Sequence, residues 1–95
     1  MTDQLEEIDL LGPQGTNVRV KKGDLVAFIN PEIFDDGRTQ SLHQSMLKHT
    51  EEEIGPGPYV VRRIERYGNG SEVLLIQGTE NREKTVNEAY LTKAG

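Results

Sequence analysis

The clearest pattern of apolar and polar positions lies in the second half of the chain. Two runs rich in β-branched and aromatic residues, 58–67 and 71–78, flank the turn Gly68-Asn69-Gly70. Asn and Gly tolerate positive φ, so a tight turn can match the right-handed twist of the strands that it joins. The pattern predicts a β-hairpin and, with it, a mainly β fold.

A further strand is expected upstream of the hairpin. Residues 18–20 alternate, residues 21–24 have the composition of a turn, and residues 25–29 form an apolar run. The run ends at Asn30-Pro31, because proline cannot donate to a strand ladder. We therefore place the first strand of the domain here.

The chain has 95 residues, which is enough for one domain with a single modest core. Residues 1–17 hold scattered leucines, several acids and a segment broken by Gly12 and Pro13. We interpret 1–17 as a flexible acidic arm and 18–95 as the folded domain.

Residues 31–57 form a long connection that needs structure of its own. Apolar residues near the helical period predict a short helix through Gln44 to Glu53, capped by Thr39 or Ser41 and ended by Gly55-Pro56-Gly57. The apolar positions are Leu42, Met46, Leu47 and Ile54.

After the hairpin, residues 84–87 predict a short strand and residues 88–91 a single 3₁₀ turn before a last strand. The expected core is made of one face of each strand: Leu25, Ala27, Phe28, Ile29, Val60, Ile64, Val73, Leu75 and Val86. The opposite face is expected to hold Val26, Val61, Leu74 and Ile76.

Composition narrows the function classes. Cysteine is absent, which excludes disulfides and thiolate chemistry. A net charge of −5 disfavours sequence-blind binding of nucleic acid. The longest apolar stretch falls far short of the roughly 20 residues that cross a bilayer, and the acidic start is the reverse of a signal peptide. We expect a cytoplasmic protein without a membrane segment.

The order of predicted elements is similar to that of SH3-like barrels. Lys22-Gly23-Asp24-Leu25-Val26 resembles the entry to their first strand. Gly57-Pro58-Tyr59-Val60-Val61 resembles the entry to the second strand in the C-terminal domains of retroviral and retrotransposon integrases, and residues 86–91 match the approach to their last strand. The resemblance covers residues 21–94 and extends to KOW and chromo-like domains. It implies a five-stranded SH3-like antiparallel barrel with a long, partly helical first loop.

The integrase resemblance also implies nucleic-acid binding. The residues that would grip phosphates are basic side chains of adjacent strands: Arg62, Arg63, Arg66, Arg82 and Lys84. The alternative is that these side chains pair across the ladder with Glu65, Glu72 and Glu83. The chain departs from the integrase pattern in its acidic middle loop and in having no tryptophan before Gly57-Pro58.

Other polar groups fit no catalytic or metal motif. His43 and His49 lie six residues apart, on opposite sides of a helix, and a solvated helix face explains them and Glu51–Glu53 better than a zinc site does. The pairs Asp35 with Asp36, and Ser41 with His43, lack a third orienting group. We expect no enzyme activity, no metal and no cofactor.

These observations favour a non-enzymatic interaction module that binds a protein partner, or a second copy of itself, through the 31–57 loop. Loops on rigid scaffolds commonly carry binding. The expected contact residues are apolar and acidic: Phe34, Asp35, Asp36, Met46, Glu51, Glu52 and Glu53. Nucleic-acid binding through the arginine strand is the alternative. The small size and the resemblance would suit an accessory protein of a phage or mobile element.

Overall fold

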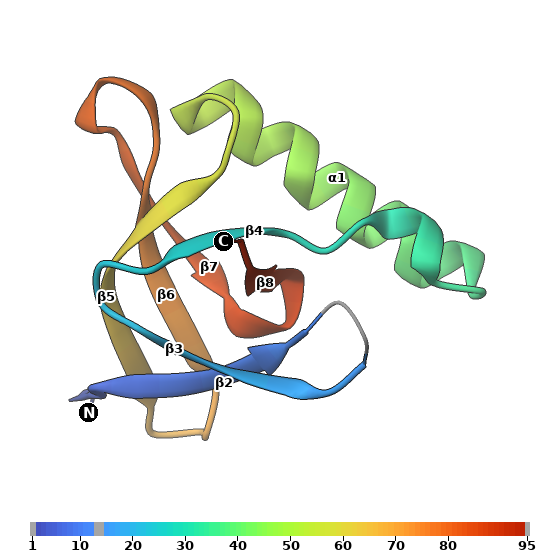
Figure 1. The fold of residues 1–95 in the computed structure, drawn as a ribbon. Coiled ribbons are helices and arrows are strands. Elements are labelled where there is room, and N and C mark those ends of the chain that lie inside the picture. Colours follow the sequence, from blue (N-terminus) through green and yellow to red (C-terminus); the bar gives the residue numbers. More distant parts are fainter. Residues whose placement is uncertain (1, 13–14, 95) are drawn as a thin grey trace.

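The protein is mainly β, with one long helix (Figure 1). The computed structural model describes residues 2–12 and 15–94. The strands are β1 (Thr2–Gln4), β2 (Glu7–Leu11), β3 (Asn17–Lys21), β4 (Leu25–Phe28), β5 (Tyr59–Tyr67), β6 (Glu72–Gln77), β7 (Glu83–Asn87) and β8 (Leu91–Lys93). The helical segments are η1 (Pro31–Ile33), α1 (Gly37–Ile54), η2 (Thr79–Asn81) and η3 (Glu88–Tyr90).

The hairpin predicted from the Gly-Asn-Gly turn is confirmed as β5 and β6. Arg66 pairs with Glu72 at its end, and the N–H of Gly70 donates to the carbonyl of Tyr67. Gly70 has a φ of 90°, a conformation that glycine adopts at little cost. β5 is the longest strand and forms the middle of a sheet ordered β7-β6-β5-β4-β8, with β1 paired to its far end.

β4 lies between the central strand and one edge of the sheet, because it pairs with β5 on one side and with the edge strand β8 on the other. A 3₁₀ turn, η3, precedes β8 as predicted. Within the described residues the sheets do not close into a barrel, since the sheet order runs from β7 to β8 without a ladder between them. The five-stranded barrel therefore stays a prediction.

The interpretation of residues 1–17 as a flexible arm does not hold for Thr2–Gln4 and Glu7–Leu11, which are paired strands, while residues 1, 13 and 14 lie outside the described part of the chain. β1 pairs with β5, and β2 forms a five-residue ladder with β3. Ile8 and Leu10 alternate with exposed polar residues on β2 and are 4% and 1% exposed. Their burial explains why the segment is held, since each large aliphatic side chain removed from water contributes about 1.5–3 kcal/mol.

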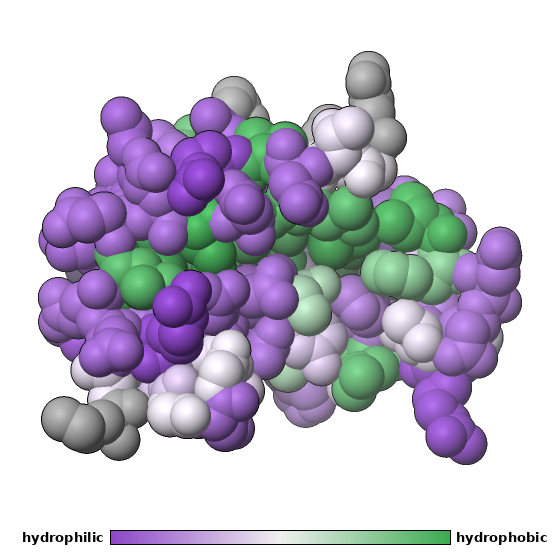
Figure 2. Space-filling view, turned by 90° about the horizontal axis from the view of Figure 1, so that it is seen from below, coloured by the Kyte–Doolittle hydropathy of each residue, from purple (hydrophilic) through white to green (hydrophobic). Residues whose placement is uncertain are grey.

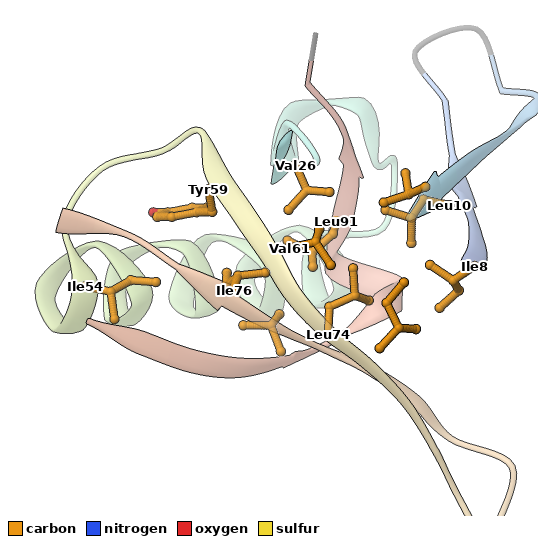
Figure 3. Packing of buried hydrophobic residues seen from close by; sticks show 12 residues of the cluster. Ile8, Leu10, Val26, Ile54, Tyr59, Val61, Leu74, Ile76 and Leu91 are labelled. Atoms are coloured by element: carbon orange, nitrogen blue, oxygen red, sulfur yellow. The ribbon is translucent and has the colours of Figure 1, made fainter. Parts of the chain in front are cut away.

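The core lies between the hairpin β2–β3 on one side of the fold and α1 on the other (Figure 1). Figure 3 shows Ile54 and Tyr59 at one end of the core and Ile8 and Leu10 at the other. Tyr59 is 1% exposed, and its hydroxyl donates to the carbonyl of Gly55 at 2.7 Å. The phenol therefore enters the core with its polar atom satisfied.

The predicted inward face of β4 is wrong, and those of β5 and β6 are partly so. Val26, Leu74 and Ile76 are buried, whereas Leu25 is 40% exposed and Leu75 is half-buried. On β5 the register shifts between Val61 and Arg63. This bulge places Val61 and Ile64 on the same inner face, although they are an odd number of positions, three, apart along the strand. Of the remaining expected core residues, Ile29, Val73 and Val86 are buried, and Ala27, Phe28 and Val60 are half-buried.

The helix predicted in the long loop is confirmed, and it is longer than expected. It spans Gly37–Ile54, and its N-cap is Asp36 rather than Thr39 or Ser41. The carboxylate of Asp36 accepts hydrogen bonds from the N–H groups of Arg38 and Thr39 and from the Thr39 hydroxyl. The buried positions of α1 are His43, Thr50 and Ile54, while Leu42 is 54% exposed.

The C-terminal end of α1 passes close to the end of β6. A Cβ atom on Gly78 would overlap the carbonyl oxygen of Ile54, and one on Gly55 would overlap the side chain of Thr79. Gly55 also has a φ of 83° and ends the helix. Two glycines thus let the backbones of α1 and η2 meet.

Candidate functional site

A shallow apolar pocket of about 330 Å³ lies where the ends of β2, β4 and η1 meet β8. It is lined by residues from four separate parts of the chain: Leu11, Gly12, Phe28, Ile29, Asn30, Ile33 and Thr92. Pockets that bind ligands have volumes of about 300–1,000 Å³ and are mostly apolar. The pocket is at the small end of this range, which suits one large side chain.

Local chemistry fixes the walls of the pocket. β4 ends before Pro31, and the Asn30 side chain accepts a hydrogen bond from the N–H of Glu32, which starts η1. On the other wall the hydroxyl of Thr92 donates to the carbonyl of Leu11, so β8 is tied to the end of β2. The pocket is therefore bounded by capped and hydrogen-bonded segments.

Two of the lining side chains are large, apolar and exposed. Ile33 is 57% exposed and Leu11 is 36% exposed. Figure 2 shows the fold from below, where apolar side chains form a band across the visible face, bordered by hydrophilic residues. Exposed apolar groups that gather at a concave place mark interaction sites more reliably than scattered ones do.

Sequence reasoning missed this pocket, although it did choose the loop to which Ile33 belongs. Ile33 stands between the acidic Glu32 and the aromatic Phe34. An aliphatic residue in a mostly polar part of the loop was the one sequence feature that could have indicated an exposed apolar contact. Leu11 and Thr92 carry no such signal, because only the tertiary fold brings them to η1.

The predicted contact residues at the start of the loop lie close to the pocket along the chain but have separate roles. Phe34 is half-buried and packs against His43, with ring centroids 4.3 Å apart and ring planes tilted by 41°. Asp35 is exposed, and Asp36 caps α1. The hydrogen bonds to Asp36, first that of the Thr39 hydroxyl, lower the pKa of its carboxyl. The carboxylate is thus held in its charged form.

The remaining predicted contact residues are spread along α1. Met46 is half-buried, whereas Glu51, Glu52 and Glu53 are exposed at the end of the helix. Glu53 forms an ion pair of 2.5 Å with Lys84. Glu51 and Glu52 line a second, polar hollow with Glu80 and Arg82. The structure therefore does not bring all seven residues to one surface.

The five basic residues of the alternative site mostly face carboxylates. Arg66 pairs with Glu72 at 2.7 Å, Arg82 with Glu80 at 3.2 Å, and Lys84 with Glu53. Arg62 approaches Glu83 at 4.0 Å. Arg63 is exposed and has no ion pair within the described part of the chain. The pairing leaves little unbalanced positive charge along β5 and β7.

His43 is the most buried titratable group of the loop, at 7% exposure. Its ring lies between Phe34 and Tyr90, whose centroids are 4.3 and 4.7 Å away. Burial lowers the pKa of His43, which favours the neutral imidazole. Its Nδ1 has no hydrogen-bond partner among the described residues, so no Ser41 hydroxyl meets it there. In the same residues no group of three His, Asp or Glu side chains is arranged to hold a metal ion.

Comparisons with protein-family models, curated proteins and solved structures find no match to this chain. In the residues that the structure describes, no helix has both the length and the apolar character needed to span a membrane.

Proposed function

We propose that this chain is a non-enzymatic interaction module that binds a segment of a protein partner at the pocket between η1, β2 and β8. The observation that carries the proposal is the exposure of Ile33 and Leu11 beside an apolar pocket of about 330 Å³. A side chain of the partner would fill the pocket and cover both residues. Such a central apolar anchor supplies most of the affinity in many interfaces.

We further infer that the domain is a variant of the SH3-like barrel. Two observations support this: β4 pairs with both β5 and β8, and a 3₁₀ turn separates β7 from β8. The 31–57 loop would then be the first loop of that barrel, and its η1 segment would form one wall of the binding site.

The nucleic-acid alternative has less support, because four of its five basic side chains approach a carboxylate. Phosphate binding would first have to break those pairs. This alternative is tested by titrating the protein into a labelled oligonucleotide at low salt, where phosphate contacts are strongest. Binding there would favour the nucleic-acid alternative over the protein partner.

The test is selection of binding peptides from a displayed random library. We expect the wild-type protein to enrich a peptide family and Ile33→Asp to lose it, because a carboxylate would enter the apolar site. The matched control is Leu42→Asp, which places the same charge on an exposed leucine of α1 outside the pocket. Enrichment that survives Ile33→Asp, or fails for the wild type, would refute the proposal.

A further inference from the structure

We propose, as an extension that rests on the proposed function, that the bound segment carries a large apolar side chain next to a lysine or arginine. The pocket itself is apolar, and its walls offer the Asn30 side chain and backbone groups as polar contacts. The charge that would select the neighbouring residues lies on its η1 side.

Residues 30–40 carry three carboxylates and one guanidinium, that of Arg38. Glu32 sits between the pocket residues Asn30 and Ile33, and Asp35 and Asp36 follow within three residues of Ile33. All three acids are exposed. This rim is therefore net negative.

The acids of this rim have no ion pair among the described residues, whereas six other carboxylates of the fold do. Glu7 and Asp9 pair with Arg19, and the carboxylates facing the basic residues of β5, β7 and η2 are paired as well. Asp36 is engaged by the first turn of α1, but the carboxylates of Glu32 and Asp35 have no cationic partner in the part of the chain that the structure describes, so an incoming cation can pair with them.

The cation closest in sequence to the pocket on its other wall is Lys93, which follows Thr92 on β8. Successive side chains of a strand point to opposite faces, so Lys93 is directed away from the face of Thr92. It does not offset the acidic rim. A basic residue beside the apolar anchor would therefore meet carboxylates, whereas an acidic one would be repelled.

Electrostatic complementarity of this kind raises the association rate and the specificity more than the raw affinity. The apolar side chain is the anchor, and the neighbouring cation selects among partners that offer a similar anchor. The pocket could instead be occupied by a second copy of this chain, and the experiment below distinguishes that occupant from a partner peptide.

The experiment uses one peptide selected on the full chain and compares two double charge reversals. Glu32→Lys/Asp35→Lys reverses the rim and spares Asp36, which caps α1. Glu51→Lys/Glu52→Lys makes the same charge change at the far end of α1. We expect the rim variant to weaken binding about tenfold and the control less than about threefold, from the size of exposed charge pairs.

The selected peptides should also be enriched in Lys or Arg within a few residues of the apolar anchor, and their affinity should fall as salt is raised. Selected peptides whose binding is lost in Ile33→Asp but which are not enriched in Lys or Arg would overturn this inference and leave the proposed function standing. Equal effects of the two double reversals would overturn it too. A dimer in sedimentation velocity that Ile33→Asp dissociates would make a second copy the occupant, again against the inference.

Discussion

The interior of the sheet and the layer beneath α1 are buried to a similar degree but are built from different groups. We call this layer, formed by the buried helix residues His43, Thr50 and Ile54, the seam. Inside the sheet, Val26, Ile64, Leu74 and Ile76 are all fully buried and purely apolar. Under α1 the buried set includes a histidine and a threonine. The Nδ1 of His43 and the Oγ1 of Thr50 lack hydrogen-bond partners in the described residues, a condition that costs free energy.

Because the sheet interior is purely apolar and the layer under α1 is not, we expect the two regions to differ in local stability. The sheet is a rigid scaffold, whereas α1 is held mainly near its ends. One end rests on the packed rings of Phe34, His43 and Tyr90, and the other on Ile54 and the ion pair of Glu53 with Lys84. We expect α1 to open locally at a lower free energy than the sheet, since local stability follows buried apolar contact.

The largest expected effect is a core truncation in the sheet. Leu74→Ala should lower the free energy of unfolding by about 2–5 kcal/mol, the usual range for a large buried aliphatic side chain. Its neighbour gives the control: Leu75→Ala, on the half-buried outer face, should cost about 1 kcal/mol. Urea unfolding measures both. Equal losses would mean that the inner face of β6 is assigned incorrectly.

Removing a buried polar atom from the seam should have the opposite sign. Thr50→Val replaces the unpaired hydroxyl with a methyl group of similar size and should stabilise the fold by about 1 kcal/mol. Thr85→Val, at an exposed position of β7, should change the stability by less than about 0.5 kcal/mol. A loss of stability in Thr50→Val would indicate that the hydroxyl is hydrogen-bonded after all.

The seam should also make stability depend on pH. Because burial lowers the pKa of His43 below its ordinary value of 6.5, the unfolded chain binds a proton more readily than the folded protein does. Stability should therefore decline as the pH falls through about 6.5, and this contribution should level off below the folded-state pKa. Thermal unfolding measured between pH 8 and pH 5 records the decline.

Two histidine variants identify the source of that pH dependence. His43→Phe should abolish the decline near neutral pH, because the buried imidazole between Phe34 and Tyr90 is removed. His49→Gln changes an exposed histidine of the same helix and should leave the decline in place. A decline that persists in His43→Phe would contradict this prediction.

The smallest expected effect concerns the N-terminal end of α1. Asp36→Ala removes the acceptor of three hydrogen bonds, so amide exchange in the first turn of the helix should become faster. Asp35→Ala, one position earlier, removes a charge that takes no part in the cap made by Asp36 and should leave that exchange nearly unchanged. Sheet amides should be unaffected in both variants, which would separate the helix from the scaffold.

The sequence predicted those elements whose signal is local. The Gly68-Asn69-Gly70 turn, the 3₁₀ turn before β8 and the helix of the long loop each depend on a few neighbouring residues, and all three are present. The alternation of Glu7, Ile8, Asp9 and Leu10 was an equally local strand signal. The glycines and the proline that follow it led us to interpret this segment as an arm.

The sequence could not predict features that depend on the tertiary arrangement. The runs 25–29 and 73–76 are apolar at every position, so no alternation distinguishes their inner face from their outer face. The bulge in β5 reverses the alternation after Val61. The pocket joins Leu11, Ile33 and Thr92, which no short-range pattern connects.

The pairing of β4 with β8 sets the time at which the nascent chain can fold. Ala27 pairs with Thr92, so β4 leaves the ribosome long before its partner strand exists. Through that interval the apolar runs 25–29 and 73–76 have no completed core. Non-local pairing of this kind slows folding and leaves apolar surface open to aggregation. During translation, the apolar surface of β4 should therefore stay incompletely covered until β8 has emerged.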